Sequence, residues 1–412
     1  MSEYYDIAES VVLNIYPNTE RVSVLDKMHF RALDADFNAT EILDAYDSII
    51  WTEKYNEVGD FEIHGGISDQ LISILNTSPY IFNSVTSTLM IIESPNVNYD
   101  EEEGDTLTIK GRSFSSILDR RIILTTYTVM NPTDARISQI ICDLVSDAFA
   151  LSDSQSPRYW DKLEVVNSTS VSSVELPTDV GLQFTMGDSI LKIVTDICNA
   201  FNLGFKFEYS IADDVVKFIV YEGVDHSVQG EDLIVFSDLY DNLLSSNETI
   251  DFSSEKNTIL VIGNAEDPNN ENLPKLPQVL SPDSPTGLSR REMFLKADVD
   301  DVIHNGDDPP TTSTMTNAEY IALLEQAGLD ELNKLDNKIR RYYEGEIIET
   351  LKCSYGEESS TGSEIFSLGD VIVFRMPHSS FATARLDAIT FSDDANEGKT
   401  LAPSFDYGQN GS

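Results

Sequence analysis

The fold is decided by residues 47–63, DSIIWTEKYNEVGDFEI, which contain two strand-like runs separated by a short polar segment. Both runs are rich in β-branched and aromatic residues. Phe61 and Ile63 alternate with acidic neighbours, as is typical of a strand with one buried face. Gly59 and Asp60 can adopt a positive φ, so we expect a tight turn just before the second strand. The stretch therefore predicts a β-hairpin.

Trp51, one of only two tryptophans in the chain, lies in the first strand of this hairpin. Large aromatic side chains are usually buried, so we expect Trp51 in a β-barrel core. The alternative is an exposed aromatic platform with Tyr46 and Tyr55, which would bind sugars. The two interpretations differ in whether the indole ring is accessible to solvent.

Similar short runs of Val, Ile, Thr and aromatic residues extend outward from the hairpin, punctuated by Gly, Asn and Pro. They fill residues 1–122 and return at 236–264 and 346–412. We expect a first β-barrel-like domain at 1–122. A second is expected to combine 236–264 with 346–412.

Residues 123–235 show a helical spacing of apolar residues instead. A first helix is expected to begin after Asn131 or Thr133, either of which can act as its N-cap. A second is expected to end at Gly204 as its C-terminal cap. Its apolar stripe consists of Ile190, Ile193, Val194, Ile197 and Phe201. Two strand-like runs follow, so this segment predicts an α/β module of two helices and a small antiparallel sheet.

Residues 265–345 predict a proline-rich loop and helix insertion. Seven of the 15 prolines lie between 268 and 310. We expect this part to be mostly loop, with residues 290–301, RREMFLKADVDD, as its one ordered segment.

A helix should follow the loop, because Thr316 and Glu319 form a capping-box pattern. Gly328 is expected to interrupt that helix near its middle. The predicted fold class is α+β and mainly β: two β-barrel-like domains, an inserted α/β module and a helix-containing insertion.

The net charge is strongly negative, because 27 Lys and Arg stand against 71 Asp and Glu, giving −44. Such a surface repels nucleic acid and anionic membranes. It serves solubility, or forms a wall past which DNA slides without binding. No window approaches the roughly 20 apolar residues that span a bilayer, so no membrane insertion is expected. The start, MSEYYDIAES, shows no secretory signal, and production in the cytoplasm is expected.

No motif in the sequence indicates catalysis. The patterns G-x-S-x-G, H-E-x-x-H and the Walker A run are absent, and no two of the five histidines have metal-ligand spacing. Cys198 or Cys353 could pair with a distant histidine as nucleophile and base, but no local signature supports this. Cys142 and Cys198 are expected to be buried free thiols. We therefore predict no catalytic residue and no enzyme.

No residue is predicted to bind a metal or cofactor. Asp298, Asp300 and Asp301 form an acidic cluster that could hold calcium, but their spacing does not continue into an EF-hand loop. A solvated loop is the favoured interpretation.

Five stretches, in the same order, resemble a family of siphovirus tail proteins, the ReqiPepy-type tail-hub family. They are YDSIIWTEKYNEVGDFEI at 46–63, LTIKGRSFSSILDRRII at 107–123, LSRREMFLKADVDD at 288–301, TNAEYIALLEQAGLDEL at 316–332, and a closing set of YEGEI, FSLGDVIVF and TARLDAITFS with LAPSFDYG. The motif residues are Trp51, Gly59, Asp60, Phe61, Gly111, Arg112, Arg120, Arg121, Arg290, Arg291, Gly369 and Asp370. Arg120 and Arg121 are expected to pair with carboxylates at an interface or inside the fold.

The resemblance implies a structural virion protein similar to the trimeric hubs of phage baseplates. Two β-barrel-like hub domains per subunit would give a homotrimer a pseudo-sixfold ring that mates with a distal tail protein ring. Other tail-tip or fibre proteins and the tape measure would be further partners. DNA would pass without specific binding, and the ring would assemble in the host cytoplasm and lie at the tail tip of the virion. The alternatives are a host-receptor or carbohydrate-binding tail protein and a tail-associated peptidoglycan hydrolase.

Overall fold

The computed structural model describes residues 28–100, 104–130, 136–166, 181–228, 233–305, 311–334, 337–348, 353–355, 364–376, 381–396 and 398–406. The chain divides into two compact units. Unit 1 comprises residues 1–248 and 343–407, and unit 2 comprises 249–342 and 408–412. Strands predominate over helices, so the predicted mainly β class is confirmed.

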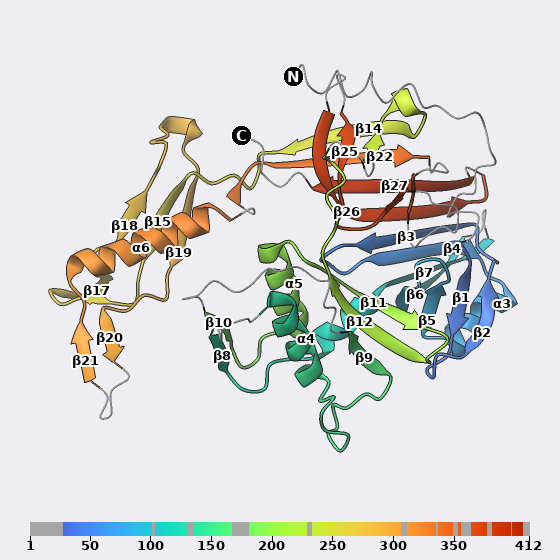
Figure 1. The fold of residues 1–412 in the computed structure, drawn as a ribbon, viewed down its shortest axis with the longest axis horizontal. Helices are drawn as coiled ribbons and strands as arrows, with labels where there is room; N and C mark the ends of the chain where they lie inside the picture. Colours follow the sequence, from blue (N-terminus) through green and yellow to red (C-terminus); the bar gives the residue numbers. More distant parts are fainter. Residues whose placement is uncertain are drawn as a thin grey trace. The chain divides into compact units, whose positions relative to one another are not determined.

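A 13-stranded sheet contains most strands of unit 1 (Figure 1). Its main path runs β14 (Leu243–Asp251), β22 (Arg340–Ile347), β27 (Gly398–Asp406), β26 (Phe381–Asp394), β3 (Ser48–Lys54), β4 (Asp60–Gly66), β7 (Gly104–Ser113), β6 (Leu89–Asp100), β5 (Tyr80–Asn83), β1 (Phe30–Leu33) and β2 (Ala39–Leu43). Off this path, β13 (Val235–Phe236) pairs with β25 (Val371–Arg375), and β25 pairs with β26. Short helices α3 (Asp69–Thr77), η2 (Phe114–Arg120) and η3 (Asp238–Tyr240) and the pair β23 (Cys353–Tyr355) and β24 (Glu364–Phe366) complete this part of unit 1.

One strand pair joins the two β regions of the sequence. The red strand β26 runs antiparallel beside the blue strand β3, with Phe391 opposite Trp51 (Figure 1). Because β3 and β26 pair with each other, both regions merge into one sheet. Among the described strands the path has two free ends, β14 and β2, and no pairing closes either region into the expected barrel.

The predicted hairpin is formed by β3 and β4, with Trp51 opposite Phe61. The expected positive φ at its turn is wrong, because neither Gly59 nor Asp60 has one. Gly59 is needed for space instead: a Cβ there would lie 2.1 Å from the carbonyl oxygen of Thr52. The chain folds back so tightly on β3 that only a residue without a side chain fits.

The α/β module also lies in unit 1. It contains β8 (Tyr127–Met130), α4 (Ile137–Ala148), β9 (Leu163–Val166), β10 (Gly181–Phe184), α5 (Ile190–Phe201), β11 (Gly204–Ser210) and β12 (Val215–Tyr221). The two helices and the antiparallel β11–β12 hairpin are as predicted. However, β9 joins β12 in parallel, so this sheet is mixed, because the long crossover through α5 allows a parallel return. Cys142 and Cys198 are buried and free, as expected.

The ends of the two helices differ from prediction. Asn202, not Gly204, caps α5, with φ 56° and ψ 40° in the left-handed region. Gly204 instead starts β11, and a Cβ there would lie 2.2 Å from the ring of Tyr55. The proposed N-caps Asn131 and Thr133 lie outside the described residues.

Unit 2 has far more regular structure than its prolines suggest. It contains β15 (Thr258–Ile262), β16 (Glu266–Asp267), β17 (Asn270–Pro274), β18 (Gln278–Leu280), η4 (Gly287–Ser289), β19 (Glu292–Lys296), β20 (Val302–Asn305), β21 (Thr311–Thr314) and α6 (Asn317–Leu332). The prediction of mostly loop is wrong, because the strands are short enough to leave prolines at or between their ends. Within the segment expected to be ordered, 290–301, residues Glu292–Lys296 form β19, but this strand is one of several in the stretch.

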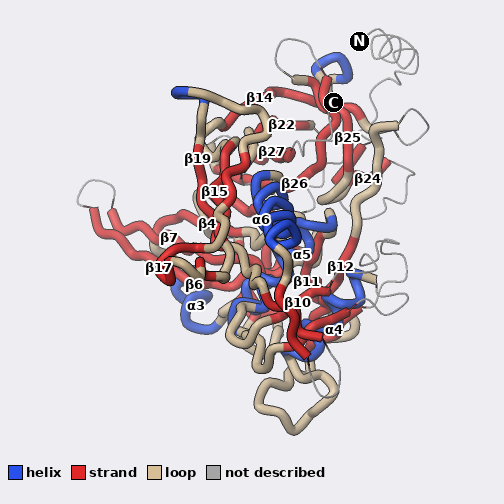
Figure 2. The backbone as a smooth tube through the Cα atoms, turned by 90° about the vertical axis from the view of Figure 1, so that its left-hand side faces the viewer, coloured by secondary structure: helices blue, strands red, loops and turns tan. Residues whose placement is uncertain are grey.

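Helix α6 packs on the three-stranded sheet β18–β15–β19 (Figures 1 and 2). It runs unbroken through Gly328, so the predicted interruption is wrong. A Cβ at Gly328 would lie 2.5 Å from both Leu280 Cδ1 and Val261 Cγ2. The glycine therefore serves the close approach of helix and sheet. In the part of the chain that the structure describes, no helix combines the length and apolar character needed to cross a bilayer.

The predicted capping box of α6 is confirmed and provides a test of its local stability. The Thr316 hydroxyl accepts from the Glu319 amide at 3.3 Å, and Glu319 Oε2 accepts from the Thr316 amide at 2.8 Å. Thr316→Ala is expected to lower the opening free energy of the first turn by about 1 kcal/mol. Hydrogen exchange measured by mass spectrometry over 316–332 would detect this. Asn317→Ala should leave that exchange unchanged; equal acceleration by both would contradict the cap assignment.

Candidate functional site

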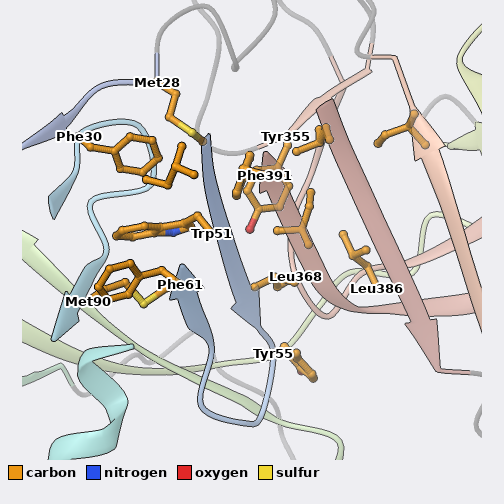
Figure 3. Close-up of a cluster of buried hydrophobic side chains, with 14 of the residues drawn as sticks. Met28, Phe30, Trp51, Tyr55, Phe61, Met90, Tyr355, Leu368, Leu386 and Phe391 are labelled. Carbon is orange, nitrogen blue, oxygen red and sulfur yellow. The ribbon is translucent and has the colours of Figure 1, made fainter. Parts of the chain in front are cut away.

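Five of the twelve motif residues lie on three adjacent strands of unit 1. Trp51 on β3 is opposite Phe61 on β4, which is opposite Gly111 on β7. The indole of Trp51 is wholly buried and lies between the rings of Phe30 and Phe61, at centroid distances of 5.0 and 6.0 Å (Figure 3). Trp51 is therefore a core residue and offers no platform to a sugar.

Gly111 makes this close packing possible. A Cβ at that position would lie 1.8 Å from the carbonyl oxygen of Ile91 on β6 and 2.6 Å from Cε1 of Phe61. The register between β6 and β7 shifts next to it, between Ile92 and Ser94. The glycine leaves room both for the aromatic ring and for the neighbouring backbone.

Arg112 points away from this core and forms a two-pronged ion pair with Glu93. The distances from its Nε and Nη2 to the two carboxylate oxygens are 2.7 and 2.9 Å. These hydrogen bonds lower the pKa of Glu93 and raise that of Arg112. Both side chains are partly exposed, so the pair contributes little stability.

Arg120 and Arg121 follow β7, at the end of η2, and form a second group. Within the described residues no carboxylate lies at ion-pair distance from either, so the expected pairing inside the fold is not found. Instead, the Arg121 guanidinium lies 4.8 Å from the centroid of the Phe149 ring. Burial, then the nearby Arg158 and Arg120, lowers the pKa of Arg121. Pairing at an interface stays a prediction.

Gly369 and Asp370 form a third group, in the turn before β25. Gly369 has φ 93°, and a Cβ there would lie 2.2 Å from the Tyr55 ring. The Asp370 carboxylate is buried, and burial raises its pKa. It accepts hydrogen bonds from the amides of Val224 and Ser367, both at 2.7 Å, so this turn is held against the end of the α/β module.

Tyr55 connects the hairpin to the same region. Its hydroxyl donates to the carbonyl of Asn202 at 2.9 Å and accepts from the Gly223 amide at 3.3 Å. Burial raises the pKa of Tyr55 to about 12. The neutral hydroxyl acts as donor and acceptor together.

Arg290 and Arg291 belong to unit 2 and form the fourth group. Arg290 pairs with Glu292, and Arg291 Nη1 lies 2.7 Å from Glu255 Oε2. In the nearby acidic cluster, the Asp301 carboxylate pairs with Lys275 at 3.1 Å. The described residues contain no group of three His, Cys, Asp or Glu side chains suited to hold a metal ion.

Glu53 was not foreseen from the sequence; among the described residues of unit 1 it is the buried carboxylate that accepts the most side-chain hydrogen bonds. Its residue is only 7% exposed. Oε1 accepts from Trp51 Nε1 at 2.9 Å, Thr86 Oγ1 at 2.6 Å and Thr88 Oγ1 at 2.7 Å. Oε2 accepts from the Tyr355 hydroxyl at 3.4 Å. The four donors come from three separate segments, so Glu53 holds β23 and the β5–β6 turn against β3.

A signal for Glu53 was present in the sequence. Ile49, Trp51 and Glu53 alternate along β3, Tyr55 continues the alternation just beyond its end, and all four are buried. A carboxylate that alternates with buried apolar residues along a strand lies on the buried face. A buried carboxylate needs several hydrogen-bond donors. The alternation therefore pointed to a polar cluster, although not to its partners.

Comparison with known proteins identifies the family. A family model described as Siphovirus ReqiPepy6 Gp37-like protein matches residues 29–405. The chain belongs to this family. The membership expected from the five motif stretches is thereby confirmed, and this siphovirus tail protein is a component of the virion.

Solved structures of other tail proteins resemble the chain. The tail protein from Neisseria meningitidis MC58 has a TM-score of 0.51 at 12% identity, covering 92% of this chain and 96% of that one. The 43 kDa tail protein of prophage MuSo2 from Shewanella oneidensis has a TM-score of 0.49 at 11% identity, covering 92% and 97%. The first similarity shows that this siphovirus tail protein shares its fold with the Neisseria protein. No curated protein matches the sequence.

Proposed function

We propose that this siphovirus tail protein is a tail-hub subunit, which forms a ring at the distal end of the tail and has no enzymatic role. The family match over residues 29–405 carries the proposal, because it spans both β regions and the α/β module between them. As the motif resemblance implies, the ring would link the tail tube or distal tail ring to the tip.

The fold supports a structural role. The pairing of β3 with β26 makes the two β regions one continuous sheet, which suits a stiff wall element. Trp51 and Gly111 are motif residues used for packing, and the motif residue Asp370 holds a turn.

The negative net charge supports the proposal that the ring is a channel for DNA. With a net charge of −44, the protein repels the DNA phosphates, so DNA can leave through the ring without binding to it. The distal tail protein ring, tail-tip or fibre proteins and the tape measure are the proposed partners. Assembly in the host cytoplasm is proposed because Cys142 and Cys198 are free thiols.

Oligomeric state is the first test of the hub proposal. We expect the purified protein to form a homotrimer, with a mass three times that of the 45.9-kDa chain in size-exclusion chromatography with light scattering. A cryo-EM reconstruction of the tail should then place three copies next to a six-membered ring. A protein that stays monomeric and is absent from the tail tip would contradict the proposal.

One of the two alternative functions loses support, and the other is tested directly. Carbohydrate binding was motivated by an exposed Trp51, and that side chain is buried. A peptidoglycan hydrolase would produce a lysis band in a zymogram on purified host cell wall, and such a band would overturn the non-enzymatic proposal.

A further inference from the structure

A cavity of about 220 Å³ opens beside Glu53 in unit 1. Its lining includes Thr86, Thr88 and Tyr355, which bond to Glu53, and the rings of Phe205 and Tyr221. Partly exposed side chains such as Glu57 also line it, so it is reachable from solvent. The volume lies below the roughly 300–1,000 Å³ of pockets for drug-sized ligands, so its occupant is a small group.

The charges around the cavity are unbalanced. Three carboxylates and two ammonium groups line it. Lys54 lies 3.0 Å from Glu57, and Lys206 pairs with Glu208. Among the described residues, Glu53 is therefore the one lining carboxylate without a cationic partner.

The hydrogen bonds of Glu53 are also uneven. Oε1 accepts three bonds of 2.6–2.9 Å and is saturated, whereas Oε2 accepts one long bond from Tyr355 at 3.4 Å. A carboxylate oxygen has room for two good donors. One oxygen of a buried carboxylate thus retains acceptor capacity at the wall of a cavity.

We propose that this cavity binds a guanidinium group. A guanidinium supplies the missing positive charge and an N–H donor for the remaining acceptor capacity of Oε2. It is also less strongly hydrated than an ammonium and stacks on aromatic rings, such as those of Phe205 and Tyr221. Lys206, an ammonium that lines the cavity, already pairs with Glu208 and lies 5.1 Å from the centroid of the Tyr221 ring.

The test uses the full-length protein labelled with 5-fluorotryptophan. The chain has two tryptophans, and the Trp51 indole donates to Glu53, so its ¹⁹F signal reports on the site; a Trp160→Phe variant assigns it. Titration with n-butylguanidinium should shift this signal saturably, with a dissociation constant on the order of 1 mM. Neutral n-butylurea, of nearly the same shape, should not. Equal responses to both compounds, or no saturable shift, would overturn the proposal.

Variants localise the binding. Glu53→Gln is expected to weaken n-butylguanidinium binding by about tenfold or more. Glu57→Gln removes a lining carboxylate that is paired with Lys54 and should leave the affinity within about twofold. An equal loss of affinity in both variants would mean that the guanidinium does not bind at Glu53, and would contradict the proposal. If Glu53→Gln does not fold, the comparison with n-butylurea on the unmodified protein still decides the matter.

The source of the group is distinguished by a second ligand. Binding of Nα-acetyl-arginine amide would indicate that an arginine side chain of a neighbouring tail protein can reach Glu53. Binding of n-butylguanidinium alone would indicate a free small guanidine. Both outcomes support a guanidinium site, and failure of the hub proposal would leave this result unaffected because the readout does not depend on assembly.

Discussion

Gly111→Ala is expected to lower the free energy of unfolding of unit 1 by about 3 kcal/mol or more. The added methyl would lie 1.8 Å from the Ile91 carbonyl oxygen and 2.6 Å from Phe61 Cε1. The first contact is with backbone, so a rotamer change cannot relieve it, and β6 must move away from β7. Both tryptophans, Trp51 and Trp160, belong to unit 1, so fluorescence during urea unfolding measures the loss.

Gly66→Ala is the matched control for this substitution. Gly66 is also a strand glycine on this sheet, but a Cβ there meets nothing within 4 Å. Alanine should be neutral or slightly stabilising at this position, because it restricts the unfolded chain. A similar loss for both variants would mean that glycine matters for strand flexibility, and the close-approach explanation of Gly111 would be wrong.

Glu53→Ala is expected to lower the same free energy of unfolding by about 3 kcal/mol. The substitution leaves the buried Trp51 Nε1 without its acceptor and removes the charge-assisted bonds to two threonines. The Thr86 and Thr88 hydroxyls lie 2.7 Å apart and can then bond to each other, so the unpaired indole accounts for most of the loss. Urea unfolding followed by tryptophan fluorescence measures the change.

Glu57→Ala separates this effect from a general loss of negative charge. Glu57 lies in the turn that follows β3, but its side chain is 53% exposed and its ion pair with Lys54 is at the surface. Its loss should change stability by less than about 1 kcal/mol. If Glu53→Ala proved as mild as this control, Glu53 would not be the residue that holds the cluster together.

Local patterns account for what could be predicted. The β3–β4 hairpin, helices α4, α5 and α6 and the Thr316–Glu319 capping box depend on residues close in sequence, and all were foreseen. The glycines were harder, because a glycine that permits a turn and one that permits close packing look the same. Gly59 and Gly328 were read as a turn and a helix break, and both proved to be contact positions.

The functional residues also divide into those predictable from local sequence and those that depend on distant parts of the chain. The motif stretches alone identified the siphovirus tail family, because family membership depends on which residues occur and in what order along the chain. The burial of Trp51 could be expected, but its place opposite Phe391 required the distant strand β26. The prolines of unit 2 led to the prediction of one long loop. Prolines are also common in the short connections between strands, so their number does not exclude a sheet.

By itself, then, the sequence determined the mainly β class, the three long helices, the buried thiols of Cys142 and Cys198, the family and the net charge of −44. The tertiary structure alone decided that the two β regions form one sheet and that Glu53 gathers Trp51 and Tyr355 beside a cavity. The reason is separation along the chain: Glu53 and Tyr355 stand 302 positions apart. Local periodicity specifies which face of a strand is buried, whereas only the folded chain specifies what lies against that face.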